Sequence, residues 1–443
     1  MRPQPPTAPN GLAAMVLFVV GCFGTEGGNP HGVRDLGPVT DMATSSDGFA
    51  PSQDGGGPCG VDAGPAAPRC GDGVAPAECP CAVGESVAFA ESATGHGQRT
   101  TLLGPTTTGG FVAVHTRTCT EDCHVTRRWT LEVHRFDEGG AAIGEPVEVT
   151  RSSPWIDQGA LLMEDSLVLV FADERAGPSG ISDLYFARLD LATGEWAVAP
   201  RLLISASLPI LQVWLAATTG GFGLLYSFSV ETFETETPGA HLVRLDQSGS
   251  VVMDPMRVVD HPNEAAGFAV NGDGFLLGRW TTGTLELVPL SADGAATGPA
   301  TTWSSNIRGN RELSIAPSAA GHRIVWSDAV GLHTATADAD GAPTRTSTML
   351  GLGIARDVVA RADGSAAILW SPRAPCDPTP GVEPFVLTRV DVSGARLQPD
   401  LVVHQSTGSS YGGELVDTAR GLVASYVTTQ PASRAYWVDV CLP

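Results

Sequence analysis

The sequence predicts an all-β protein built from seven similar units, and three observations lead to this prediction. Short apolar segments of alternating polarity recur from about residue 98 to the C-terminus. Turn sequences rich in Gly and Asp separate these segments. No 11-residue window keeps a helical spacing of apolar residues. Each unit offers four strands, most clearly at 159–163, 167–172, 184–189 and 196–204.

Two markers recur along the units. The first is a small residue that opens an apolar run. The second marker is an alternating segment that ends in Asp and a Gly turn, as at Asp190 and Asp246. We interpret these Asp residues as hairpin residues, because their side chains can accept hydrogen bonds within the turn. Calcium binding is the less favoured interpretation, since one carboxylate per turn falls short of about six to eight oxygen ligands. The first marker lies at Gly110, Ser166, Gly221, Gly274, Gly321, Gly364 and Gly421.

The spacing of the first marker and the two ends of the repeat region predict a closed ring. Successive first markers lie about 43 to 57 residues apart, which is close to a kelch-like period. Seven units of four strands fall within the about four to eight blades of a β-propeller. The last unit stops after its third strand at Cys441, and residues 84–92 resemble an isolated fourth strand. We therefore predict a monomeric seven-bladed β-propeller over 84–443, closed by its N-terminal strand, because an open solenoid would leave bare sheet edges.

One unit carries a resemblance to known repeats. The segment ADERAGPSGISDLYFARLDLATG, residues 172–194, is similar to exported bacterial repeats of the form W-x-D-x-R-x-G…D-I-Y-x-x-R-L-D-x-x-G. The resemblance covers this unit well and about 340 residues loosely. It implies a β-propeller, and that class of repeats has no catalytic motif to transfer.

The first 83 residues read as an export signal followed by a linker. Residues 1–22 contain an apolar run too short to span a bilayer, and the run ends in Val-Val-Gly-Cys. This ending resembles a bacterial lipobox, which implies lipidation of Cys22 and a lipoprotein of the outer membrane or cell surface. Ordinary secretion to the periplasm or medium is the alternative. Residues 23–83 are rich in Gly, Pro, Ser and Asp, and we expect a disordered tether.

Composition excludes several classes of function. The formal net charge of −22 argues against nucleic-acid binding, which needs a basic face. The sequence contains no lysine, so a Walker phosphate loop and a lysine Schiff base are excluded. We expect no cofactor.

Eight cysteines remain besides Cys22, an even number that suits disulfides in an oxidising compartment. The predicted ring places Cys441 near Cys81 or Cys79, so a bridge from either could close it. Cys119 and Cys123 share one loop and could pair, or could form a zinc site with His115 and His124. The pairing of Cys59, Cys70 and Cys376 with the unused member of Cys79 and Cys81 stays open.

The entries to the predicted innermost strands suggest a site. Five of the seven units carry an acid there, and we call these residues the channel-mouth carboxylates: Asp157, Glu264, Glu312, Asp357 and Glu414. If they converge, they suit a cation, a basic ligand, or glycoside hydrolysis by paired carboxylates. The plain alternative is that they are solvated at strand ends. The leading hypothesis is a surface-tethered binding or scaffold module for an unknown protein, glycan or cationic ligand. The alternatives are a polymer- or glycan-degrading hydrolase and a purely structural surface protein.

Overall fold

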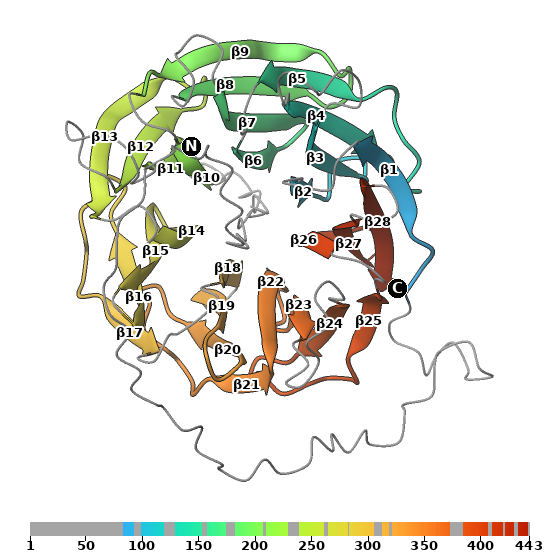
Figure 1. The fold of residues 1–443 in the computed structure, drawn as a ribbon. Helices are drawn as coiled ribbons and strands as arrows, with labels where there is room; N and C mark the ends of the chain where they lie inside the picture. Colours follow the sequence, from blue (N-terminus) through green and yellow to red (C-terminus); the bar gives the residue numbers. More distant parts are fainter. Residues whose placement is uncertain are drawn as a thin grey trace, which may run out of the picture.

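The structure is a computed structural model in which 28 strands form seven antiparallel sheets of four strands each. The sheets stand as blades around a common centre (Figure 1). The described residues are 83–92, 99–118, 129–152, 157–173, 182–206, 210–228, 239–260, 265–281, 283–304, 312–318, 321–372, 384–405, 410–419, 421–428 and 433–441. The predicted fold class is confirmed.

In blades 1 to 6 the four strands follow one another in chain order from the centre of the ring to its outer edge (Figure 1). Blade 1 contains β2 (Arg99–Leu103), β3 (Phe111–Thr118), β4 (Trp129–Phe136) and β5 (Val147–Ser152), and blade 2 contains β6 (Gln158–Met163), β7 (Ser166–Asp173), β8 (Asp183–Asp190) and β9 (Trp196–Ile204). Blade 3 contains β10 (Ile210–Thr218), β11 (Gly221–Phe228), β12 (Ala240–Asp246) and β13 (Val251–Val259), and blade 4 contains β14 (Ala265–Asn271), β15 (Gly274–Thr281), β16 (Thr284–Leu290) and β17 (Thr301–Ser304). Blade 5 contains β18 (Leu313–Ser318), β19 (Gly321–Ser327), β20 (Leu332–Ala337) and β21 (Thr348–Gly351), and blade 6 contains β22 (Gly353–Ala360), β23 (Ala366–Pro372), β24 (Phe385–Val390) and β25 (Leu401–His404).

Blade 7 combines the two ends of the repeat region. Its strand order is β26 (Ser410–Thr418), β27 (Gly421–Thr428), β28 (Ser433–Cys441) and β1 (Val87–Ser92). β1 pairs antiparallel with β28, with Val87 opposite Trp437 and Glu91 opposite Arg434. Just before β1, the Gly84 amide donates to the Asp439 carbonyl at 2.7 Å. The predicted closure by the N-terminal strand is therefore confirmed, and β28 is not left as a bare sheet edge.

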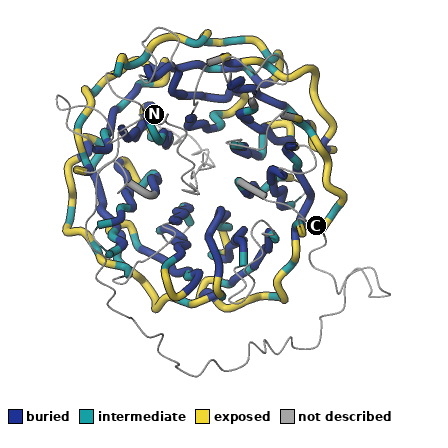
Figure 2. The backbone as a smooth tube through the Cα atoms, viewed as in Figure 1, coloured by how far each residue is buried: buried dark blue, intermediate teal, exposed yellow. Residues whose placement is uncertain are grey.

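The core lies between the blades. Seven buried apolar clusters each join two neighbouring blades, and the last of them packs Val416 and Trp437 of blade 7 against Leu102 and Phe136 of blade 1. The second strands β7 and β11 are buried along their whole length. The outermost strands carry much of the exposed backbone (Figure 2). Packing continues around the ring, so every blade depends on two neighbours.

Close approach of the backbone explains the first marker at four of its seven positions. A Cβ atom added at Gly110, Gly221, Gly274 or Gly321 would lie 2.0 to 2.1 Å from a carbonyl oxygen of the third strand in the same blade. Real Cβ contacts of this length do not occur, so these positions favour glycine for lack of space. Ser166 occupies the corresponding position at the start of β7.

The second marker closes hairpins as predicted. Asp246 Oδ1 accepts hydrogen bonds from the amides of Ser248 (2.8 Å) and Ser250 (2.9 Å). Asp391 Oδ1 accepts from the amides of Ser393 (2.7 Å) and Ala395 (3.0 Å). These hydrogen bonds to the charged form lower the pKa of both carboxyls, and the Ser248 and Ser393 hydroxyls contribute most.

Several sequence predictions fall outside the described residues. These include the lipidated Cys22, the linker, the His124 side chain, Glu264 and every cysteine except the backbone of Cys441. The lipoprotein, disulfide and zinc hypotheses therefore stay predictions. Within the described part of the chain, no helix could cross a membrane.

Candidate functional site

Four channel-mouth carboxylates lie in the described structure, and all four are buried. Asp157 and Glu312 come immediately before β6 and β18, whereas Asp357 and Glu414 lie inside β22 and β26. Their exposed fractions are 1%, 2%, 3% and 5% in that order. The interpretation of these four as solvated acids at strand ends is therefore wrong, because their side chains are almost fully buried.

Asp157 connects three blades. Its Oδ2 accepts a hydrogen bond from the Val213 amide of blade 3 at 2.6 Å, and its Oδ1 pairs with the Arg99 guanidinium of blade 1. Burial raises the pKa of Asp157, while the charge of Arg99 and the Val213 amide act against that rise. The carboxylate thus holds blades 1, 2 and 3 together at the centre.

Asp357 makes the corresponding contact between blades 6 and 7. Its Oδ2 accepts from the Leu415 amide at 2.7 Å, and its Oδ1 accepts from the Val358 amide at 2.7 Å. Burial raises the pKa of Asp357 to about 7 despite these two amides. Burial also raises the pKa of Glu414 well above its usual value, and the negative charge of Asp357 raises it further.

Arg99 is the residue that sequence reasoning missed. Its positive charge lowers the pKa of Glu414 and also opposes the rise at Asp157, so it lies within electrostatic reach of both. Blade 1 has no acid at this position, and its innermost strand β2 begins with the base Arg99 instead. The structure therefore brings Asp357, Glu414, Arg99 and Asp157 into one arc across blades 6, 7, 1 and 2, and Glu312 lies in blade 5, beside blade 6.

The Glu414→Gln variant is expected to lose less stability than the wild type when the pH rises from 5 to 8. The raised pKa values mean that the protonated forms of Asp357 and Glu414 favour the fold. This stability is fully present below the unfolded pKa of about 4 and is lost as pH rises through the folded values, near 7 for Asp357. The variant removes one of these two acids, and with it the part of the pH dependence that comes from the raised pKa of Glu414.

The measurement is the urea midpoint of both proteins at pH 5 and pH 8. Histidines with lowered pKa values, such as His241 and His404, contribute the opposite slope in both proteins, so the difference between proteins isolates the acids. Glu195→Gln, at an exposed position, is the control. Equal pH dependence of stability in the wild type and Glu414→Gln would show that the pKa of Glu414 is not raised in the folded protein.

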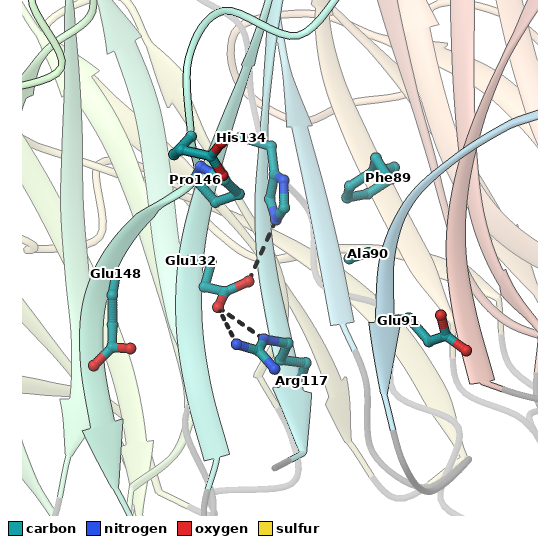
Figure 3. A pocket seen from close by; sticks show the side chains of 9 residues that line it. Phe89, Ala90, Glu91, Arg117, Glu132, His134, Pro146 and Glu148 are labelled. Carbon is teal, nitrogen blue, oxygen red and sulfur yellow. Dashed lines mark hydrogen bonds and ion pairs between the residues drawn. The ribbon is translucent and has the colours of Figure 1, made fainter. Parts of the chain in front are cut away.

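A second candidate site lies at the joint where the ring closes. Phe89, Ala90 and Glu91 of β1 face residues of blade 1 across a hollow of about 360 Å³ (Figure 3). We call this hollow the rim pocket. The other lining residues are Arg117, Glu132, His134, Glu145, Pro146 and Glu148. A bulge in β1 between Ala88 and Ala90 interrupts the pairing with β28 at Phe89.

Glu132 is the charged centre of the rim pocket. Its Oε1 accepts from Arg117 Nε at 2.7 Å and lies 2.6 Å from Arg117 Nη2, and its Oε2 lies 3.5 Å from His134 Nε2. Burial alone would raise the pKa of Glu132, but His134 and Arg117 together lower it to about 2. Glu132 is thus a fixed negative charge beneath a partly open surface.

Aromatic packing fixes the floor of the rim pocket. The Phe89 ring meets His134 edge-to-face at 5.1 Å and His115 at 5.7 Å. His115 Nδ1 lies 2.9 Å from Thr100 Oγ1, and burial, with His134, lowers the pKa of His115 to about 3. His115 is therefore neutral at physiological pH. In the described residues, no group of three or more His, Cys, Asp or Glu side chains is placed to hold a metal ion.

Comparison with known proteins finds similarity in fold only. No protein-family model matches the sequence, and no curated protein matches it. The Dos1 propeller is 13% identical, with a TM-score of 0.45 over 80% of this chain and 94% of that chain. The Cps50 (Swd1) β-propeller domain of Myceliophteria thermophila is 10% identical, with a TM-score of 0.49 over 81% and 99%. A NanB sialidase of Streptococcus pneumoniae is 9% identical, with a TM-score of 0.43 over 81% and 70%.

These similarities concern the fold alone, because the three chains are only 9 to 13% identical to this one. The class of protein rests on the geometry described above. The chain is a seven-bladed β-propeller closed by its own N-terminal strand.

Proposed function

We propose that this β-propeller is a binding or scaffold module rather than an enzyme. The observation that supports this proposal is the use of the central carboxylates. Asp157 and Asp357 are buried and accept amide hydrogen bonds from the next blade, at Val213 and Leu415. A carboxylate used in this way stabilises the ring and is closed to a polymer substrate. Function then falls to the outer surface and its loops, which is where propellers offer room for partners.

Hydrolysis is the second candidate, and one observation favours it. A carboxylic acid with a pKa of about 7 suits general acid catalysis at neutral pH, and Asp357 has this value with Glu414 beside it. Both residues are almost fully buried, so a substrate would need the two innermost strands to separate.

Turnover assays separate the two candidates. The binding proposal predicts no turnover of a panel of aryl glycosides and aryl esters by the wild type, at any pH from 4 to 8. It also predicts that Asp357→Asn and Glu414→Gln change stability only. Turnover by the wild type that Asp357→Asn abolishes, while circular dichroism shows a retained fold, would establish the hydrolase instead.

A further inference from the structure

We propose that the rim pocket binds the arginine side chain of a basic peptide segment. This inference rests on the proposed binding function and names its ligand class. The pocket joins two distant parts of the chain, residues 89–91 of β1 and six residues of blade 1 (Figure 3): Arg117, Glu132, His134, Glu145, Pro146 and Glu148. Its volume of about 360 Å³ lies at the lower end of the range of about 300–1,000 Å³ for ligand pockets. This space suits one long side chain.

The charge of the lining selects a cation. Four of the nine lining residues are glutamates, and Arg117 is the one guanidinium among them. Glu132 Oε1 faces that guanidinium, but Glu91 and Glu148 make only exposed ion pairs, to Arg434 at 3.4 Å and Arg151 at 2.6 Å. Exposed ion pairs contribute little and exchange readily with an incoming charge. Glu145 lies exposed at the edge of the same pocket.

A buried polar atom independently points to a ligand. The His134 side chain is only 8% exposed, and its Nε2 makes no hydrogen bond although it lies 3.5 Å from Glu132 Oε2. Figure 3 shows this imidazole standing beside the Glu132 carboxylate at the pocket wall. A carboxylate oxygen can accept more than one hydrogen bond, and a guanidinium N–H can donate one. An incoming guanidinium would therefore add a donor to the Glu132 carboxylate beside this imidazole.

The shape of the lining favours arginine over lysine. Phe89 and Pro146 provide apolar walls for an aliphatic stem, and the ring of Phe89 can stack against a planar guanidinium. Carboxylates bind guanidinium through parallel N–H donors, which the ammonium group of lysine cannot match. Within the pocket itself, two nitrogens of the Arg117 guanidinium, Nε and Nη2, both approach Glu132 Oε1.

Isothermal titration of the full chain tests the proposal with a matched pair of probes. The first probe is acetyl-Gly-Arg-Gly-amide, and the second replaces arginine with citrulline, which has nearly the same shape but no charge. We expect the arginine peptide to bind at least about tenfold more tightly than the citrulline peptide. Raising NaCl from about 50 to 300 mM should weaken the arginine peptide selectively, because exposed charges are screened.

Variants locate the binding. Glu145→Gln combined with Glu148→Gln should weaken the arginine peptide by about tenfold or more. Glu195→Gln, at an equally exposed glutamate just before the outer strand β9 of blade 2, should leave affinity unchanged. Phe89→Leu should weaken binding of the arginine peptide while urea unfolding reports on the stability of the ring.

Three results would overturn the inference: no binding of the arginine peptide, equal binding of the citrulline peptide, or equal losses in the Glu195→Gln control. None of these would touch the binding or scaffold proposal, which the turnover assays test separately. Conversely, turnover at Asp357 would refute that proposal whatever the rim pocket binds.

Discussion

Removal of the closing strand is expected to lower the free energy of unfolding by about 3–5 kcal/mol. The comparison is between a chain that begins at residue 83, which keeps all 28 strands, and one that begins at residue 93, which lacks β1. Both chains lack Cys81, so a bridge to Cys441 cannot contribute to the difference. Urea unfolding followed by tryptophan fluorescence gives the measurement.

The size of this effect follows from what β1 covers. Without β1, β28 becomes an open edge, and the five pairs from Val87–Trp437 to Ser92–Ser433 are lost. The Phe89 ring also leaves its contacts with Phe136 (5.8 Å) and His134 (5.1 Å), at the joint between blades 7 and 1. The open edge should cause concentration-dependent association in gel filtration. Equal midpoints and a monomeric shorter chain would contradict the role assigned to β1.

Gly274→Ala is expected to destabilise the protein by about 2–3 kcal/mol. The added Cβ would lie 2.1 Å from the Leu290 carbonyl oxygen, and the backbone there is fixed because Phe275 pairs with Leu290. To relieve this clash, β15 and β16 would have to separate in the middle of blade 4. Thermal and urea unfolding of the purified variant provide the test.

Gly298→Ala is the matched control in the same blade. Its Cβ would meet Pro289 Cγ at 3.5 Å, which is an ordinary van der Waals contact. Stability should change by less than about 0.5 kcal/mol. If Gly274→Ala were as stable as Gly298→Ala, lack of space could not be the reason for the first marker.

The fold was predictable because short sequence signals specify each turn and strand, and these signals recur from unit to unit. The turn at Asp246 uses amides within four residues of the carboxylate. Gly274 is required by the Leu290 carbonyl oxygen, which lies about 16 residues away in the same hairpin. The closing strand was predictable because the last unit lacked one strand and residues 84–92 supplied it. Each of these signals needs only the residue types and a count of units.

The sites were less predictable because they depend on contacts between units. Sequence reasoning found Asp157 and Asp357 but left open whether they converge on a site or are solvated, and it did not predict their burial. That burial comes with contacts to the adjacent blades at Val213 and Leu415. Arg99 lies 58 residues from Asp157, and no local pattern pairs them. The rim pocket was missed altogether, because it forms only when β1 joins blade 7 at ring closure and faces residues of blade 1. The β1 bulge that accompanies Phe89 leaves no clear trace in residue types.

Amide hydrogen exchange of the intact protein tests ring closure most directly. The account predicts that a peptide covering residues 84–92 is protected from exchange and that residues 433–441 are protected on both sides of their strand. It also predicts that a chain beginning at residue 93, which lacks β1, exchanges faster in residues 433–441. Exchange in the blades on the far side of the ring should be less affected. Exchange of residues 84–92 at the rate of an unfolded peptide, with residues 433–441 unchanged by the truncation, would contradict the closed ring.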